Sequence, residues 1–325
     1  MRTMKFCQHN DGARFDRVAP QPYYLPMMRS FYVVTPSLNQ SALLEQCIAS
    51  VADQAGVRVH HHVQDAVSTD GTVPFLEHYK QHVDASRESK ESYSFSYESV
   101  PDSGMYDAVN CGWRRSEGAY DIYAYLNCDE QYLKGALSAV ADRFESRPAL
   151  DVVFGNVLVI APDGDLICRR DVVAPSKYLI LTDHLPIYTA ATFVRGATLF
   201  SNQLFFDPKW KVIGDAEWAL RLFDLNPAFE IMKDYLSTFV FSRNNLSLSP
   251  AAKTETDKLR ARAPRLARHL SKPIKLCHWL RKARAGAYFP KTVSYDIYVT
   301  GHSQRTHFTV RGANNLWWER LRDPT

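Results

Sequence analysis

Four polar residues, Asn127-Cys128-Asp129-Glu130, follow directly on the apolar run Ile122 to Leu126. An apolar run with β-branched and aromatic members is typical of a buried strand. Acids that end such a strand lie at its carboxyl end, where open α/β sheets bind their ligands. A carboxylate there can hold a hard divalent cation, which can in turn hold a diphosphate. Taken alone, the tetrapeptide favours an ordinary solvated strand end, so its meaning depends on the rest of the chain.

Three earlier segments repeat the pattern of a predicted strand that ends in a polar cluster. The predicted strands are 31–34, 57–63 and 94–100, and the clusters are 35–39, 64–72 and 101–110. Apolar residues at helical spacing lie in 44–51, 76–83 and 133–144. Ser68 or Thr69 is the predicted N-cap of the second helix. Strands and helices that alternate in this way predict a doubly wound, mostly parallel α/β sheet with the four polar clusters along one edge.

With these motifs in view, the chain resembles the inverting family-2 glycosyltransferases, which have the Rossmann-like GT-A fold. The matching segments are 34–40, Asp65 with 68–72, 103–110, 126–130 and 214–221. The resemblance implies transfer of a sugar from a nucleotide-diphosphate sugar, most often a UDP-sugar, to an acceptor hydroxyl. It also implies Mn²⁺ or Mg²⁺ as the cofactor. By analogy with the family, the acceptor is a cell-surface glycan or a lipid-linked glycan.

The resemblance assigns roles to individual residues. Asp129 would ligate the metal, and Asp215 would be the general base that takes the proton from the acceptor hydroxyl. Asp65 would accept a hydrogen bond from the nucleotide base, and Asp107 would help to close the nucleotide site. The other residues expected to bind the nucleotide sugar are Thr35, Pro36, Ser37, Asn39, Asn110 and Asn127. The residues expected on the acceptor side are His184, Arg195, Glu217 and Trp218.

Three positions depart from the family pattern. Asn127 stands where many members have Asp, Gly214 replaces the Glu that often precedes the base, and Cys111 replaces a common Lys. The first change removes a negative charge from the expected metal site. The second leaves open how the base is oriented. For Asp215 the alternative interpretation is a simple N-cap, because Asp is strongly preferred at that position.

Other conspicuous residues favour structural interpretations. Strand alternation sends His61 to the opposite face from His60 and His62, so hydrogen-bonded strand histidines are expected rather than a metal cluster. Trp113 is expected to pack in the core or at its rim, whereas for Trp218 packing and stacking on a sugar are equally expected.

The length of 325 residues and the hydrophobic content of 46% allow a large core and about two domains. We expect an N-terminal extension over 1–30, a GT-A catalytic domain over 31–245 and a basic accessory segment over 246–325. The six cysteines lack paired CxxC spacing, and residues 1–30 lack the apolar core of a signal peptide. These features predict a cytoplasmic protein with reduced thiols. The stretches 152–160 and 166–168 are predicted to form a hairpin, as are 293–299 and 306–310.

Residues 258–284 hold ten Lys or Arg and no acid, so the rest of a chain with net charge +4 carries −6. Two interpretations stay open: the segment docks on an anionic membrane surface, or it packs across the negatively charged catalytic domain. In the first case the enzyme would be peripheral on the cytoplasmic membrane face.

Two alternatives come from other functional classes. A nucleotidyltransferase would carry a Gly-rich, basic loop after the first strand, and residues 36–40 contain neither glycine nor a cation. A non-catalytic nucleotide- or nucleic-acid-binding protein could use the basic segment. That segment lacks the aromatic residues interleaved on a base-reading surface, so nucleic acid is not an expected partner.

Overall fold

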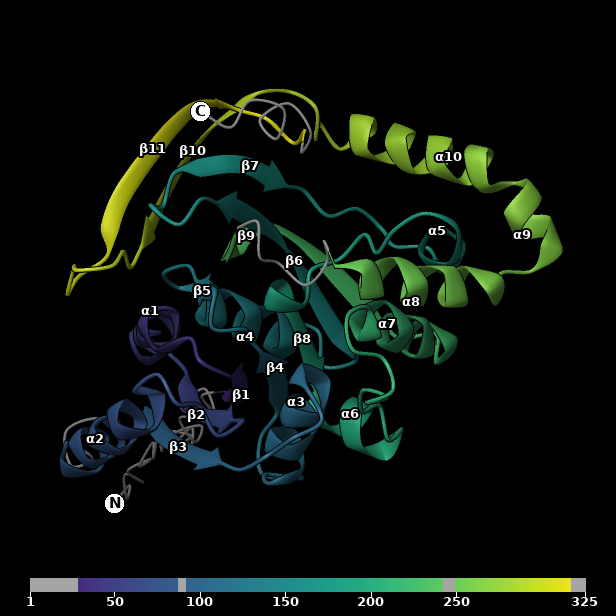
Figure 1. The fold of residues 1–325 in the computed structure, drawn as a ribbon. Coiled ribbons are helices and arrows are strands. Elements are labelled where there is room, and N and C mark those ends of the chain that lie inside the picture. Colours follow the sequence, from purple (N-terminus) through teal and green to yellow (C-terminus); the bar gives the residue numbers. More distant parts are fainter. Residues whose placement is uncertain (1–28, 87–91, 242–248, 317–325) are drawn as a thin grey trace, which may run out of the picture.

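The computed structural model describes residues 29–86, 92–241 and 249–316. Within them lies a nine-stranded sheet in the order β3-β2-β1-β4-β8-β6-β9-β5, with β7 paired to β6 (Figure 1). Most of the predicted N-terminal extension, Cys7 and the boundary near residue 245 lie outside the described residues. The strands are β1 (Ser30–Ser37), β2 (Arg58–Asp65), β3 (Tyr93–Ser99), β4 (Ile122–Tyr125), β5 (Glu130–Tyr132), β6 (Val152–Ile160), β7 (Leu166–Arg170), β8 (Thr192–Arg195) and β9 (Phe229–Val240).

The first four predicted strands form the parallel part of this sheet, β3-β2-β1-β4. Their register places Ser37 beside Asp65 and Val34 beside Tyr125. The polar clusters that follow these strands therefore share one edge, as the sequence predicted. Beyond β4 the sheet is mixed, because β8 runs antiparallel to both β4 and β6. The predicted hairpin of β6 and β7 is confirmed.

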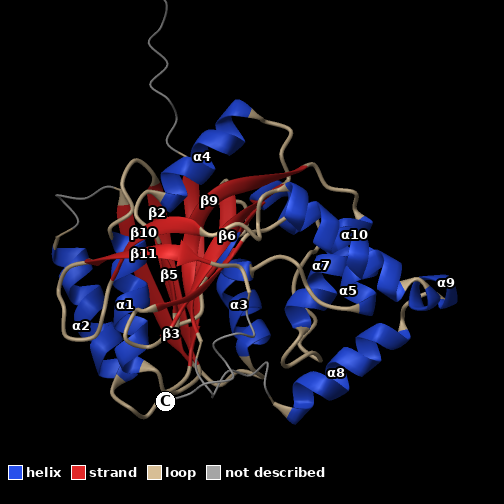
Figure 2. Ribbon diagram, turned by 90° about the horizontal axis from the view of Figure 1, so that it is seen from above, coloured by secondary structure: helices blue, strands red, loops and turns tan. Residues whose placement is uncertain are grey.

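Helices cover both faces of the sheet (Figure 2). Along β1 the side chains alternate, so that Phe31 and Val33 belong to one core cluster and Tyr32 and Val34 to the other. The first cluster includes α1 (Ser41–Ala52), α2 (Thr72–Ala85) and α4 (Ala136–Ser146). The second includes α3 (Met105–Arg114), α5 (Lys177–Thr182), α6 (Gly196–Ser201) and α7 (Gly214–Asp224). This double coverage confirms the predicted fold class.

The predicted N-cap of α2 is wrong. The cap residue is Gly71, at a φ of 94° that a residue with a side chain would rarely adopt. The backbone and hydroxyl of Ser68 instead donate to Asp65, and the backbone N–H of Thr69 donates to Asn39. These side chains therefore join two loops instead of beginning a helix.

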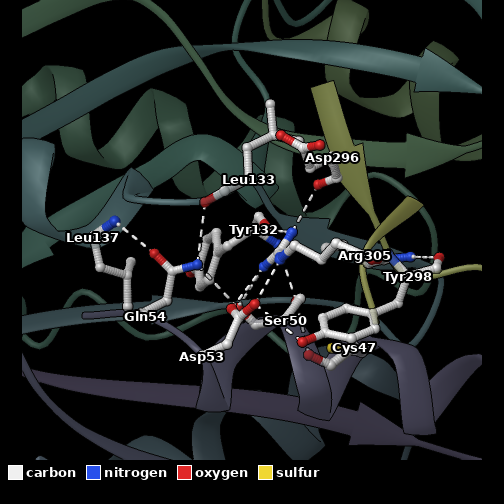
Figure 3. Close-up of polar contacts among 11 residues, drawn as sticks. Cys47, Ser50, Asp53, Gln54, Tyr132, Leu133, Leu137, Asp296, Tyr298 and Arg305 are labelled. Atoms are coloured by element: carbon white, nitrogen blue, oxygen red, sulfur yellow. Dashed lines mark hydrogen bonds and ion pairs between the residues drawn. The ribbon is translucent and has the colours of Figure 1, made fainter. Parts of the chain in front are cut away.

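The second predicted hairpin is also confirmed, as β10 (Lys291–Ile297) and β11 (Thr306–Ala313). Arg305 precedes β11 and fastens the hairpin to α1 and β5 (Figure 3). Its guanidinium donates to both carboxylate oxygens of Asp53, at 2.6 and 2.7 Å, and to the carbonyl of Tyr132 at 2.9 Å. The hairpin thus packs directly on the edge of the nine-stranded sheet.

The basic stretch folds into α8 (Pro250–Ala261), α9 (Arg265–His269) and α10 (Ser271–Arg284). Figures 1 and 2 place these helices at the opposite end of the molecule from α1 and α2. In the part of the chain that the structure describes, none of the helices has both the length and the apolar character required to cross a bilayer.

Candidate active site

The acids after β4 lie in a poorly solvated turn. The side chain of Glu130 is buried, and one of its oxygens accepts a hydrogen bond from the backbone N–H of Asn127 at 2.8 Å. Burial, and then the charge of Asp129, raise the pKa of Glu130. Burial also raises the pKa of Asp129. A cation bound here would relieve the cost of ionising two crowded carboxyl groups.

The oxygen atoms available at this turn suit a hard divalent cation. The side-chain oxygen Oδ1 of Asn127 is buried and has no hydrogen-bond partner among the described residues. With the Asp129 carboxylate it supplies neutral and anionic oxygen donors, which Mg²⁺ and Mn²⁺ prefer. Among the described residues, no group of three or more His, Cys, Asp or Glu is arranged to hold a metal. A cation held by Asn127 and Asp129 would need its remaining ligands from a diphosphate and water.

Asp215 comes to the same region from a distant part of the chain. It lies in the first turn of α7, whose N-cap is Ile213, so the interpretation of Asp215 as the N-cap is wrong. Its Oδ1 accepts from the backbone N–H of Ala216 at 2.8 Å and from the hydroxyl of Tyr106 at 3.4 Å. Burial raises its pKa to about 6. Its charge also raises the pKa of Glu130, so the two acids lie within electrostatic reach.

The glycine before Asp215 has a steric reason. A Cβ atom on Gly214 would lie 2.6 Å from Cε2 of Tyr106, so the tyrosine ring occupies the space that a side chain would need. The hydroxyl of Tyr106 donates to the carbonyl of Val212 at 3.0 Å as well as to Asp215. Tyr106 on α3 thus orients the carboxylate of Asp215. This contact holds the predicted base although Gly214 replaces the Glu that often precedes it.

A second carboxylate supports the loop before Asp215. Glu255 on α8 accepts hydrogen bonds from the backbone N–H groups of Lys211, Val212 and Ile213, at 2.8 to 3.1 Å. These bonds hold the N-terminus of α7 from outside the family motifs. The sequence does not single out Glu255, because nothing in its local pattern distinguishes it from a surface acid of a helix.

Several predicted nucleotide-binding residues meet where β1 and β2 end. The buried Asp65 carboxylate accepts from the backbone of Ser68 at 2.9 Å and from the hydroxyl of Ser99 at 2.6 Å. Asn39, at a left-handed φ of 53°, accepts from the backbone N–H of Thr69 at 2.7 Å. The hydroxyl oxygen of Ser37 is buried and lacks a partner among the described residues. The two loops are thereby locked together beside the β4 turn.

Two further predicted residues flank this region. The carbonyl of Pro36 accepts from the thiol of Cys128 at 3.3 Å, which ties the end of β1 to the acidic turn. Asp107 lies in the first turn of α3 and accepts from the backbone and the hydroxyl of Ser103, at 3.0 and 2.7 Å. These hydrogen bonds lower the pKa of Asp107, so it is an anion at neutral pH.

Two predicted nucleotide-binding residues point into the core instead. Thr35 faces α1, where its hydroxyl hydrogen-bonds with Nε2 of His61 at 2.8 Å. The alternation of side chains along β1 turns Thr35 to the α1 side, and the sequence motif does not show which side is filled. Asn110 is 1% exposed, and its amide exchanges two hydrogen bonds with the backbone of Phe206. Both predictions of a donor contact are corrected.

Two acceptor-side predictions are also wrong. Arg195 pairs in register with Ile122, at the amino end of β4, because β8 runs antiparallel to that strand. Its guanidinium donates to the carbonyl of Leu150 and lies over the ring of Phe144, at the edge of the sheet opposite to the acids. Trp218 is only 2% exposed and stacks on Phe206, so its rings are not available to a sugar.

The other two acceptor-side residues serve packing contacts. Glu217 lies two residues from Asp215 and therefore on another side of α7. Its carboxylate pairs with Arg221 at 3.0 Å and with Arg262 at 3.6 Å, which makes it a poor candidate for an alternative base. His184 hydrogen-bonds with Asp183 at 2.8 Å, and its ring meets that of His278 on α10. It joins α5 to α10.

The strand histidines behave as predicted. His60 and His62 hydrogen-bond with Ser94 and Ser96, each at 2.8 Å, whereas His61 faces Thr35 on the other side. Trp113 is buried in the core, also as expected.

Comparisons with known proteins agree with this architecture. The family model described as glycosyl transferase family 2 matches residues 32–205, which is more than half of the chain. The match includes four of the five sequence motifs, and the segment with Asp215 lies beyond it. A search of curated proteins finds no match.

Among solved structures, TarS of S. aureus has a similar fold. The structure of TarS 1–349 in complex with UDP-GlcNAc has a TM-score of 0.53 and 14% sequence identity, covering 86% of this chain and 99% of that one. A longer TarS structure has a TM-score of 0.52 at 14% identity and covers 87% of this chain. The present chain spans 60% of that longer chain. At this identity the likeness concerns the fold.

Proposed function

This chain belongs to glycosyl transferase family 2 and has the GT-A fold, and we propose that it is an inverting enzyme. It would move a sugar from a UDP-sugar to a hydroxyl group of a glycan or lipid-linked acceptor. The fold and the family support a nucleotide-sugar donor. UDP is the first nucleotide to test, because the TarS structure of similar fold was solved with UDP-GlcNAc.

One observation carries the proposal. The acidic turn after β4 and Asp215 on α7 lie within electrostatic reach of each other, although Asp215 follows Glu130 by 85 positions in the sequence. The turn can hold a diphosphate through a cation, and Asp215 is enclosed enough that its pKa rises to about 6. An acid with this pKa is ionised at neutral pH and is still a better base than an exposed carboxylate. General-base assistance of this kind accelerates reactions by roughly 10²–10⁴-fold.

The chemistry follows from these positions as a single displacement. The acceptor oxygen forms a bond to the anomeric carbon, and the bond from that carbon to the diphosphate oxygen breaks. The proton of the acceptor hydroxyl passes to the carboxylate of Asp215, and the nucleoside diphosphate leaves with the bonding electron pair. Tyr106 keeps Asp215 directed at the acceptor, since its hydroxyl and ring fix the carboxylate from one side.

The turn residues Asn127 and Asp129 would hold Mn²⁺ or Mg²⁺. When bound, such an ion neutralises the negative charge that develops on the departing diphosphate. Asp65 and Asn39 bring the loops after β1 and β2 together at the place where the family binds its nucleotide. Asp65 uses three hydrogen bonds from Ser68 and Ser99, and a carboxylate has about four acceptor positions. Because the side chain of Asp65 is fully buried, its part in donor binding would be to hold these two loops in place.

A thermal-shift panel of nucleotides and nucleotide sugars, with and without Mn²⁺, tests the donor. A ligand at a hundred times its Kd should stabilise the fold by about 2.7 kcal/mol. We expect UDP compounds to stabilise the protein only when Mn²⁺ is present. NMR of the product from an active acceptor should then show the opposite anomeric configuration to the donor. Retention of configuration would contradict the single displacement, and a panel without any stabilising nucleotide would contradict the donor class.

A further inference from the structure

Helix α10 directs polar side chains toward its own domain and leaves large apolar side chains exposed. The hydrophobic effect normally directs the apolar side of a surface helix toward the core. In α10 the inner side holds His278 and Lys282, which are 4% and 9% exposed. His278 meets the ring of His184, and Lys275 pairs with Asp183 at 2.9 Å. The contacts of α10 with α5 are thus made largely by polar groups.

The exposed apolar residues of α10 lie on the other side, whereas Ile274 is half-buried. Leu276, Trp279 and Leu280 are 53%, 46% and 56% exposed, and their spacing of three and four residues places them together with Ala283. We call these four residues the α10 outer face. Phe289, shortly after the helix, is 70% exposed. Exposed aromatic and leucine side chains in one cluster mark an interaction surface more often than an ordinary surface.

Cations flank the α10 outer face. Residues 258–284 contain ten Lys or Arg and no acid. Some of these cations bind the catalytic domain, as Arg262 does with Glu217 and Lys275 with Asp183. The exposed cations of α9 and α10 are Arg265, Arg268, Lys272, Arg281 and Arg284. One set of cations therefore packs on the catalytic domain, and the other set faces solvent, where membrane docking is still to be tested.

We propose that the α10 outer face docks on an anionic membrane leaflet. Its leucines and Trp279 would enter the boundary between headgroups and acyl chains, while the flanking cations contact lipid phosphates. Amphipathic helices that lie in this boundary have the same combination of an apolar strip and basic margins. An anionic leaflet attracts each nearby Lys or Arg enough to change binding by about fivefold.

Charge argues against the other occupants. A second copy of this chain would bring two sets of exposed cations together, without acids in 258–284 to pair with them. The chain segments outside the described residues do not supply an acidic partner either, because none of 1–28, 87–91, 242–248 and 317–325 contains more Asp and Glu than Lys and Arg. A nucleic acid would satisfy the cations and leave the leucine side chains exposed to water. An anionic lipid surface complements both properties.

Contacts of α8 connect the segment that carries the α10 outer face to α7, which carries the predicted base Asp215. Arg262, at the end of α8, pairs with Glu217 on α7, and Glu255 on α8 holds the backbone just before Asp215. A docked α8–α10 unit would therefore hold α7 at a defined place relative to the membrane. This step rests on the proposed function, since it brings the base to a lipid-linked acceptor, but the docking itself does not.

Co-sedimentation with sucrose-loaded vesicles tests the docking. The full chain is mixed with phosphatidylcholine vesicles, with or without phosphatidylglycerol, at low and high salt. We expect binding to the anionic vesicles at low salt and weaker binding at high salt, because the attraction to the leaflet is screened. Asp215→Asn should bind vesicles like the wild type, so that failure of the catalytic proposal and failure of docking are told apart.

Two variants separate the apolar and the electrostatic contributions to vesicle binding. Replacing Leu276, Trp279 and Leu280 with Ser should reduce vesicle binding by at least about 10-fold without unfolding, because these side chains are exposed. Arg281→Glu with Arg284→Glu should lower binding by about 30-fold or more, at about fivefold for each cation. The matched control is Lys134→Glu with Lys233→Glu, which makes the same charge change at exposed residues elsewhere. It should bind nearly as the wild type does.

Several outcomes would overturn the proposal. Equal binding to neutral vesicles would exclude an anionic surface as the partner. Wild-type binding by the Ser variant would show that the α10 outer face is not engaged. A dimer that dissociates in the Ser variant, without vesicle binding, would identify a second copy as the occupant. Salt-dependent retention of duplex DNA or RNA on a filter, unchanged by the Ser variant, together with absent vesicle binding would identify a nucleic acid.

Discussion

The acidic edge of the sheet and the α10 outer face depart from ordinary protein packing in opposite ways. At the edge, ionisable groups are enclosed, and burial raises the pKa of Glu130, Asp129 and Asp215. On α10, apolar groups such as Leu280 and Trp279 are left in water. Both arrangements cost folding free energy. Each would be relieved by a ligand of complementary character, which is a cation with a diphosphate in one case and a lipid surface in the other.

The contrast shows where function can be sought in a chain of this kind. Elsewhere the apolar side of a helix faces the core, as in α1, where Leu44, Cys47, Ile48 and Val51 are all buried. Proteins break such consistency mainly at functional sites. If the buried acids at this edge serve the reaction, substitutions there should change binding or catalysis more than they change stability.

The largest effect is expected at the metal site. Asp129→Ala should abolish the Mn²⁺-dependent binding of UDP, with a loss of affinity of at least about 10²-fold, because the only carboxylate proposed to contact the ion is removed. Isothermal titration with and without Mn²⁺ measures the change. Asp142→Ala, an exposed acid on α4, is the control. If the Asp129 variant bound UDP with an unchanged dependence on Mn²⁺, the metal assignment would be wrong.

The next effect concerns the base. Asp215→Asn keeps the shape of the side chain and removes its ability to accept a proton, so transfer should fall by at least roughly 10²-fold while donor binding survives. Initial rates and UDP titrations on the same sample separate the two properties. Transfer at a near wild-type rate would move the role of base to another residue.

A smaller effect is expected from the tyrosine that orients the base. The rate of transfer should fall about tenfold per pH unit below about pH 6, because Asp215 has a pKa of about 6 and must be ionised. The hydrogen bond from Tyr106 favours the ionised form, so Tyr106→Phe should move this acid limb to higher pH. Profiles of kcat/KM at saturating Mn²⁺ measure the shift, with Tyr120→Phe as the control. An unchanged limb would show that Tyr106 does not act on Asp215.

The smallest effect is on stability. The pKa of Asp215 is raised from its ordinary value of 3.8 to about 6, so the unfolded state loses its proton first as the pH rises. The stability that depends on the neutral carboxyl is present below about pH 4 and is lost as the pH rises through about 6. Asp215→Asn should therefore be more stable than the wild type at pH 8, by about 1–3 kcal/mol, and less different at pH 5. Urea unfolding at both pH values measures the difference. A less stable variant at pH 8 would mean that the enclosed charge does not destabilise the fold.

Much of the fold could be predicted because it depends on local periodicity. The alternation of strands and helices up to α4, both hairpins and the shared edge of the polar clusters follow from hydrophobic spacing and turn residues. The strands β5 and β9 and the antiparallel direction of β8 could not be predicted in this way. Pairing direction depends on contacts between distant segments, and for this reason the sequence does not show that Arg195 lies at the amino end of β4.

The residues of the candidate site also fall into those that motifs predict and those that only tertiary contacts reveal. Asp129, Asp65 and Asp215 could be proposed from motifs alone, and the structure brings the acidic turn and Asp215 within electrostatic reach. Thr35, Asn110 and Trp218 belong to the same motifs and face the core, because a motif does not record which side of a strand or helix is covered. Tyr106 and Glu255 became visible only through their contacts with the loop before Asp215.

The basic segment shows most clearly which properties the sequence determines and which depend on tertiary contacts. Its charge and its leucines are properties of the sequence, and they allowed two interpretations without a choice between them. The direction in which α10 presents its apolar side was decided by tertiary contacts, since Asp183 and His184 draw Lys275 and His278 inward. Helical periodicity determines which side chains share a face, but only the neighbouring elements determine whether that face meets protein or solvent.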